Sequence, residues 1–418
     1  MLTRLVGRAS VRSGVFAAAT PSQVKHVWLI SVDGLHALDL LRLNEFINRK
    51  NNLRIPERWK MKIKLFAMAC LFAVFTSGIA AQTKSHTTKQ TKEAKPPTKT
   101  VVNSPLKLLS SIPLSALKEG DFDHFAIDLE GHRLFLTAEE NGKLLVFDTN
   151  SNKLIHTIED LKAPHAVLYR KEFNKLFVVD GDESAVKIYD AQNYPLLAKV
   201  ELAADADSMA YDTAAKYMYV VNGGREAKTP YSFITVVDAA ASKKVRDIKI
   251  PSDRVEAVVL EKSGPRLFCN ITGTDTVGVM DRTQSSLQNE WKLPTGVHQN
   301  VALALDEKNH RLFVVARKPG RLVVLDSDNG KTIASLPAVG MVDDMAYDAD
   351  HQRLYLAGDQ FVDVFNQKDA DHYALLARIP GGFRAKTGIL VPELNRYYLA
   401  VPRHGNSAAK VNVYQVQP

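Results

Sequence analysis

Charged side chains that could bind a ligand or transfer protons recur along the last three quarters of the chain. They fall in a series of equivalent positions spaced by 42 to 49 residues: Asp123, His165, Asp207, Glu256, Val301, Asp343 and Lys386, of which only Val301 is uncharged. One position later the chain has His124, Ser208, Asp344 and Thr387 in four of the repeats. Carboxylates beside an imidazole and an ammonium group are suited to proton transfer and to binding divalent cations. This chemistry requires a fold that brings residues so distant in sequence together.

A repeated strand pattern accompanies this series. Short apolar runs begin at Leu134, Leu176, Met218, Leu267, Leu312, Leu354 and Tyr397, each with a Lys or Arg one or two residues earlier. An inner strand such as Phe125–Asp128 precedes each run, a second alternating strand follows it, and an outer strand such as Lys153–Glu159 comes last. Alternation of β-branched and aromatic residues with period two is typical of half-buried strands.

Four short strands in about 44 residues are the size of one β-propeller blade. Seven such units fit between residues 105 and 418. The seventh ends after its third strand, and the unassigned strand Leu106–Pro113 precedes the first unit. The sequence therefore predicts an all-β fold, a seven-bladed β-propeller of four-stranded blades. We expect the N-terminal strand to close the last blade, because closure removes an exposed sheet edge.

The blades resemble those of the YVTN-repeat, YncE-like seven-bladed propellers. Tyr219-Val220-Val221-Asn222 is nearest to the motif that names this family, and Leu267-Phe268-Cys269-Asn270 is a looser copy. The resemblance covers about three quarters of the chain. It implies a binding protein without catalytic activity, and a role in nucleic-acid binding or in the cell envelope for some relatives.

Propeller geometry places the charged series at one opening of the central axis, because loops from outer to inner strands converge there. We expect the following residues to form a ligand-binding mouth: Asp123, His124, His165, Asp207, Glu256, Asp343, Asp344 and Lys386. Carboxylates this close repel one another unless a cation or water intervenes, so a bound divalent cation is one hypothesis. The alternative is a hydrated mouth whose side chains bond to amides at the blade edges. No other cofactor is expected.

A second group of charges is expected at the rim of the same face, in loops between second and third strands. Its members are Arg225, Arg317, Arg403 and His404. A basic rim could hold an anionic ligand or an extended polymer. The alternative is that these are solvated loop charges.

Charge is divided unevenly along the chain. Residues 1–104 hold 17 Lys and Arg against 5 Asp and Glu, which leaves 37 basic and 41 acidic residues in the remainder. The propeller region therefore has no overall field that would attract nucleic acid. The two cysteines, Cys70 and Cys269, cannot form a disulfide framework or a four-cysteine zinc site, and Cys269 is expected in the core.

The segment from Met61 to Ala81 has the order of a secretory signal peptide: a cationic start, an apolar run and small residues. We interpret residues 61–81 as that signal and the Lys- and Thr-rich residues 82–104 as a disordered linker. The expected location is periplasmic or secreted, without a membrane span once the signal is cleaved. The alternative is a signal anchor over the 17 residues Leu65–Ala81, near the lower limit for spanning a bilayer.

Residues 26–40 carry a separate pattern, an apolar strand ending in Asp33-Gly34. It resembles the opening strand of the type I phosphodiesterase/nucleotide pyrophosphatase branch of the alkaline phosphatase superfamily, which implies that Asp33 matches a metal ligand. The nucleophile and further ligands of that large α/β domain are absent, because the signal segment begins at residue 61. We therefore interpret residues 1–60 as an annotation artefact or fusion fragment.

The blades contain no G-x-S-x-G, P-loop, H-E-x-x-H or dinucleotide-binding glycine pattern. We predict a binding module that takes a protein, small ligand or polymer on its axial face, without catalysis. Nucleic acid is a partner by family resemblance only. The alternative is a lactonase-like propeller hydrolase with a metal or acid–base site at the axial mouth.

Overall fold

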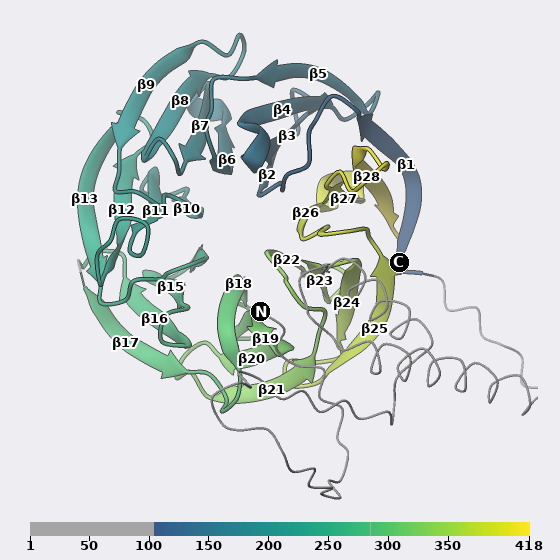
Figure 1. Cartoon of the computed structure of the whole chain (residues 1–418). Coiled ribbons are helices and arrows are strands. Elements are labelled where there is room, and N and C mark those ends of the chain that lie inside the picture. Colours follow the sequence, from purple (N-terminus) through teal and green to yellow (C-terminus); the bar gives the residue numbers. More distant parts are fainter. Residues whose placement is uncertain (1–103, 285) are drawn as a thin grey trace, which may run out of the picture. The chain divides into compact units, whose positions relative to one another are not determined.

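Seven sheets form a ring in the computed structural model, which describes residues 104–284 and 286–418 (Figure 1). Each sheet has four antiparallel strands. Each outer strand leads to the inner strand of the next blade. The seven-bladed architecture predicted from the repeats is confirmed.

The first four blades follow the chain in order. Blade 1 contains β2 (Phe125–Asp128), β3 (Arg133–Ala138), β4 (Lys143–Asp148) and β5 (Lys153–Ile158). Blade 2 contains β6 (Pro164–Arg170), β7 (Lys175–Asp180), β8 (Ala185–Asp190) and β9 (Leu196–Glu201). Blade 3 contains β10 (Met209–Asp212), β11 (Tyr217–Gly223), β12 (Ser232–Asp238) and β13 (Lys243–Ile250). Blade 4 contains β14 (Val258–Leu260), β15 (Arg266–Ile271), β16 (Thr276–Asp281) and β17 (Leu287–Lys292).

The last three blades complete the ring. Blade 5 contains β18 (His298–Asp306), β19 (Arg311–Lys318), β20 (Gly320–Asp326) and β21 (Thr332–Pro337). Blade 6 contains β22 (Asp344–Asp348), β23 (Arg353–Gly358), β24 (Phe361–Gln367) and β25 (Tyr373–Pro380). Blade 7 contains β26 (Thr387–Val391), β27 (Arg396–Val401), β28 (Ala409–Val416) and, from the start of the propeller, β1 (Leu106–Leu114). The strands nearest the axis are β2, β6, β10, β14, β18, β22 and β26. Three short 3₁₀ turns, η1 (Glu139–Asn141), η2 (Lys171–Phe173) and η3 (Pro392–Leu394), link first to second or second to third strands.

Strand β1 closes the ring by pairing with β28, as predicted. The pairing is antiparallel from Leu106 opposite Val416 to Leu114 opposite Ala409, with an irregularity between Leu108 and Ser110. Figure 1 shows the blue strand β1 beside the yellow strand β28 in this sheet. The unpaired edge that β28 would otherwise expose is thereby covered.

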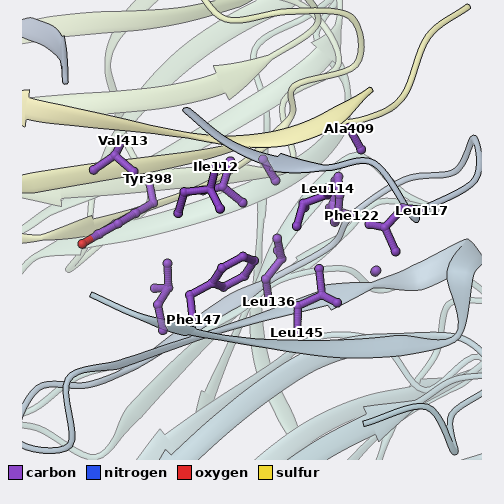
Figure 2. Packing of buried hydrophobic residues seen from close by; sticks show 14 of the residues in the cluster. Ile112, Leu114, Leu117, Phe122, Leu136, Leu145, Phe147, Tyr398, Ala409 and Val413 are labelled. Carbon is purple, nitrogen blue, oxygen red and sulfur yellow. The ribbon is translucent and has the colours of Figure 1, made fainter. Parts of the chain in front are cut away.

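Apolar side chains of β1 also contact the next blade. Ile112 and Leu114 are buried in a cluster with Leu136, Phe147 and Tyr398, which come from blades 1 and 7 (Figure 2). Burial of large aliphatic side chains contributes about 1.5–3 kcal/mol each. The closing strand therefore joins the first and last blades by packing as well as by hydrogen bonds.

The cation at the start of the second strand has a structural role in most blades. Five of these side chains donate to a backbone carbonyl just after the third strand of the next blade. The pairs are Arg133 to Ala191, Lys175 to Ala240, Arg266 to Ser327, Arg311 to Ala370 and Arg353 to Gln417. The repeated cation thus connects neighbouring blades.

Several predictions concern residues that the structure does not describe. The fragment at 1–60, the signal at 61–81 and linker residues 82–103 lie outside the described residues. Among residues 104–284 and 286–418, no helix has the length and hydropathy needed to cross a membrane.

Candidate ligand-binding mouth

The charged series lies where the inner strands begin. His165 is the second residue of β6, and the other charged members come one or two residues before their inner strands. Val301, the apolar member, lies within β18 and is buried. The members occupy equivalent positions of the seven repeats, so the ring of blades carries them to the same opening. Side-chain contacts between blades show that the structure brings most of the charged members together.

The centre of the mouth is a contact between blades 1, 2 and 3. His165 Nδ1 lies 2.5 Å from Asp123 Oδ2 and 3.6 Å from Asp207 Oδ1. A Cβ on Gly181 would come within 2.8 Å of both Cδ2 and Nε2 of His165. The imidazole therefore packs closely against Gly181, and a larger residue there would displace the ring.

A second imidazole links blade 1 to blade 6. His124 Nδ1 lies 2.9 Å from Asp344 Oδ1, and its Nε2 lies 3.5 Å from Asp123 Oδ1. The other oxygen of Asp344 accepts a 3.0 Å hydrogen bond from the backbone N–H of Gly388 in blade 7. The Asp344 carboxylate of blade 6 is therefore held by groups from blades 1 and 7.

The opposite side of the mouth is a network of carboxylates and cations. Lys386 Nζ lies 2.5 Å from Asp343 Oδ2 and 3.2 Å from Asp121 Oδ2. Asp121 also pairs with Arg384, and Asp343 with Arg317. These contacts join blades 1, 5, 6 and 7, so the acids on this side already have cationic partners.

Hydroxyl groups hold the backbone of the mouth in place. Ser208 Oγ donates to the carbonyl of Glu256 at 2.8 Å, and Thr387 Oγ1 donates to the carbonyl of Phe122 at 2.8 Å. Thr137 Oγ1 donates to the carbonyl of His165 at 2.7 Å. Each bond crosses from one blade to the next, so the segments that carry the charged side chains are fixed relative to one another.

Neighbouring carboxylates raise the pKa of both imidazoles of the mouth. Burial favours the neutral imidazole, but the charges of Asp123 and Asp344 outweigh it and raise the pKa of His124 to about 10. The pKa of His165 is also raised to about 10, because the hydrogen bond and charge of Asp123 outweigh the effect of burial. Burial alone would raise the pKa of Asp123, yet the charge of His124 and the hydrogen bond from His165 hold it well below its usual range.

Asp207 differs from the other acids of the mouth. Burial and the negative charge of Asp123 raise the pKa of Asp207 to about 7, although His165 opposes this. Its side chain is 28% exposed, and among the described residues its carboxylate accepts no hydrogen bond. The expected repulsion between acids is therefore concentrated at this one residue, while the others are compensated by basic neighbours.

An open hollow of about 310 Å³ lies beside Asp207. It is lined by Asp205, Asp207, Val221, Gly223, Arg225, Glu226, Arg254, Val255 and Glu256. Arg254 Nε bonds to Glu256 at 2.8 Å, and Arg225 lies 3.5 Å from Asp253 outside the lining. Burial, followed by the charges of Glu226 and Glu256, raises the pKa of Asp205. Four carboxyl groups thus face two guanidinium groups in the hollow.

The four rim residues have different environments. Arg225 is exposed at the hollow. Arg317 differs from expectation: its side chain is 13% exposed and pairs with Asp343 inside the mouth, because the long side chain reaches inward from the end of β19. Arg403 donates to the carbonyls of Ser115 and Leu117 beside β1. His404 stacks on Phe383 with ring centroids 3.9 Å apart. A continuous basic rim is therefore not formed.

The sequence prediction missed Asp121 and Arg254, which contact Lys386 and Glu256 of the predicted series, and Arg384, which pairs with Asp121. Each lies two positions before a predicted member, and so does Asp205 in the hollow. Because side chains at i and i+2 of an extended segment share a direction, this offset was a usable signal. Cys269 is fully buried, as expected, and burial raises the pKa of its thiol to about 12.

Comparisons with known proteins bear on the fold and not on the mouth. No known family model matches the chain. A stretch of 103 residues is 29% identical to "Uncharacterized protein YncE" of Salmonella typhi, and the Salmonella typhimurium protein of the same name is 28% identical. The stretch covers 25% of this chain and 29% of the relative in each case. The chain is a seven-bladed β-propeller, and this stretch of it is similar to YncE.

Solved structures show the same fold at low identity. Hydrazine synthase of Kuenenia stuttgartiensis matches with a TM-score of 0.60 at 16% identity, over 72% of this chain and 97% of that one. The β-propeller domain of Cps50 (Swd1) from Myceliophteria thermophila matches with a TM-score of 0.59 at 13% identity, over 75% and 100%. At these identities the likeness concerns the fold alone.

Proposed function

We propose that this YncE-like propeller is a binding module without catalytic activity, and that it takes a positively charged ligand or partner group at its axial mouth. The observation that carries the proposal is the hollow beside Asp207. Within the described residues, the carboxylates of Asp205, Asp207 and Glu226 have no hydrogen-bond donor, whereas other acids of the mouth are paired. A cationic group placed there would relieve their mutual repulsion.

The scaffold supports such a role because it is closed and rigid. Hydrogen bonds and ion pairs between blades hold the mouth segments, so little ordering would be needed when a ligand binds. The region beyond residue 104 has more acidic than basic residues, which gives nucleic acid no support as the partner.

A thermal-shift panel tests the proposal. The full chain would be heated in EDTA with L-arginine, spermidine, a neutral sugar or citrate, alongside Asp207→Asn and the control Asp275→Asn. Asp275 pairs with His298 outside the lining of the hollow. We expect a cationic compound to raise the melting temperature of wild type and the control but not of Asp207→Asn. An equal response in Asp207→Asn, or no response to any cationic compound, contradicts the proposal.

The second candidate is a lactonase-like hydrolase, and the pKa of Asp207 favours it. A carboxyl group with a pKa near 7 can accept and donate protons at neutral pH. The test measures hydrolysis of lactones and phosphodiesters with and without EDTA. Hydrolysis that disappears in Asp207→Asn would support the enzyme, and no turnover of any substrate would support the binding module.

We also propose that the protein is exported through a signal at residues 61–81. The support is the order of charge, apolar run and small residues from Met61 to Ala81. N-terminal sequencing of the protein recovered outside the cytoplasm tests this. A first residue at Ala81 or Gln82 agrees with cleavage, whereas retention of Met61 or an earlier residue contradicts it.

A further inference from the structure

We infer that Asp123, His165 and Asp207 form a binding site for one divalent transition-metal ion, of the Zn²⁺ class. The inference rests on the proposed role of the mouth and names an ion that it would hold. One ligand atom from each residue lies within 4.8 Å of the other two. The three residues come from neighbouring blades, so the ring closure and blade packing position all three ligands.

The donor set indicates the class of ion. An imidazole nitrogen with two carboxylate oxygens suits Zn²⁺ and similar transition metals better than Mg²⁺ or Ca²⁺, which prefer oxygen alone. Nδ1 of His165 already faces both carboxylates, at 2.5 Å and 3.6 Å. The ion would take the place of the proton between His165 and Asp123, and His165 would bind it as the neutral imidazole.

The position of His165 is independent support. The imidazole lies against Gly181, where any side chain would clash with Cδ2 and Nε2. The ring packs on Gly181 with its Nδ1 edge towards Asp123 and Asp207 in the absence of any ion. Metal sites require this kind of orientation of their histidine ligands.

Charge around the site allows a divalent ion. With His165 neutral, the two carboxylates balance the ion. The nearest cation, His124, is also within 2.9 Å of Asp344, and Lys386 is paired with Asp343 and Asp121. Three protein ligands leave a coordination position for water or an external ligand, and Asp207 lines the hollow that would admit it.

Calorimetric titration of the full chain with Zn²⁺ tests the inference. The variants are Asp207→Asn and His165→Gln, and the control is His298→Gln. His298 forms an exposed imidazole–carboxylate pair with Asp275 at 2.7 Å, outside the proposed site. The Asp207→Asn variant should fold for two reasons. Asparagine has the same shape as aspartate, and the Asp207 carboxylate accepts no hydrogen bond from the described residues. Far-ultraviolet circular dichroism checks each variant.

We expect about one Zn²⁺ per chain in wild type and in His298→Gln, and an affinity weaker by roughly tenfold or more in both site variants. Mg²⁺ should not compete. No zinc binding by wild type, or unchanged binding in the folded Asp207→Asn protein, overturns the inference. The thermal-shift panel of the proposed function is run in EDTA and does not depend on zinc. If a cationic compound raises the melting temperature there while the wild type binds no zinc, the metal site is ruled out and the proposed function stands.

Discussion

Shortening Ile112 to alanine should loosen the junction between the first and last blades. Ile112 is 6% exposed on the closing strand β1 and packs in the cluster of Figure 2, whereas Leu109 on the same strand is 44% exposed. Replacing a buried isoleucine by alanine costs about 2–5 kcal/mol. The same change at the exposed Leu109 should cost no more than about 0.5 kcal/mol.

The expected shift follows from the size of the propeller. An unfolding entropy of about 2.1 cal/mol/K per residue gives about 0.6 kcal/mol/K for a domain of roughly 300 residues. A loss of about 3 kcal/mol therefore lowers the melting temperature by about 5 °C, and the Leu109→Ala control by about 1 °C or less. Differential scanning calorimetry measures both.

Hydrogen exchange adds a local readout at the same junction. In Ile112→Ala, the amides of β1 and β28 should exchange faster than in the wild type. The amides of β12, which lies in blade 3, should change less. Equal shifts in melting temperature for Ile112→Ala and Leu109→Ala, with unchanged exchange in β1, would refute the argument that packing of this strand closes the ring.

Three other predictions follow from single side chains. The raised pKa of His124 means that its stabilising charge is fully present below pH 6.5 and is lost as the pH rises towards about 10; the melting temperature in EDTA should fall over that range, and less steeply in His124→Gln. Iodoacetamide at pH 8 should leave Cys269 unmodified in the native protein and label it in denaturant, because burial keeps its pKa near 12; mass spectrometry of the peptide that contains Cys269 distinguishes the two. Arg133→Met leaves the buried Asp128 carboxylate without its cation and should cost about 3–5 kcal/mol in urea unfolding. Lys171→Met removes an exposed pair with Glu130 and should leave the free energy of unfolding nearly unchanged.

The repeat spacing predicted the ring because blade strands alternate with period two and each unit has nearly the same length. It also predicted that β1 completes blade 7, since the last unit lacked one strand. The approach of Asp123, His165 and Asp207 followed from their equal spacing of 42 residues along the repeats. Ligand binding by these residues stays a prediction.

Other features of the mouth depend on side-chain reach, which spacing does not encode. Arg317 was expected on the rim, but its long side chain turns inward to Asp343. The sequence also treated the acids as one repelling group. In the structure, Lys386 and the two imidazoles compensate most of them, and only the three-dimensional arrangement shows that Asp207 is the exception.

The direction of the closing strand determines on which face of the ring the described chain begins. Strand β1 ends at Leu114, and the chain then runs to Asp123 at the mouth, so β1 begins at the opposite face of the ring. As the outermost strand of its sheet, it also begins on the perimeter. The described chain therefore enters the propeller at the edge of the face opposite the acidic opening, and the opening is not crossed by the strand that closes the ring.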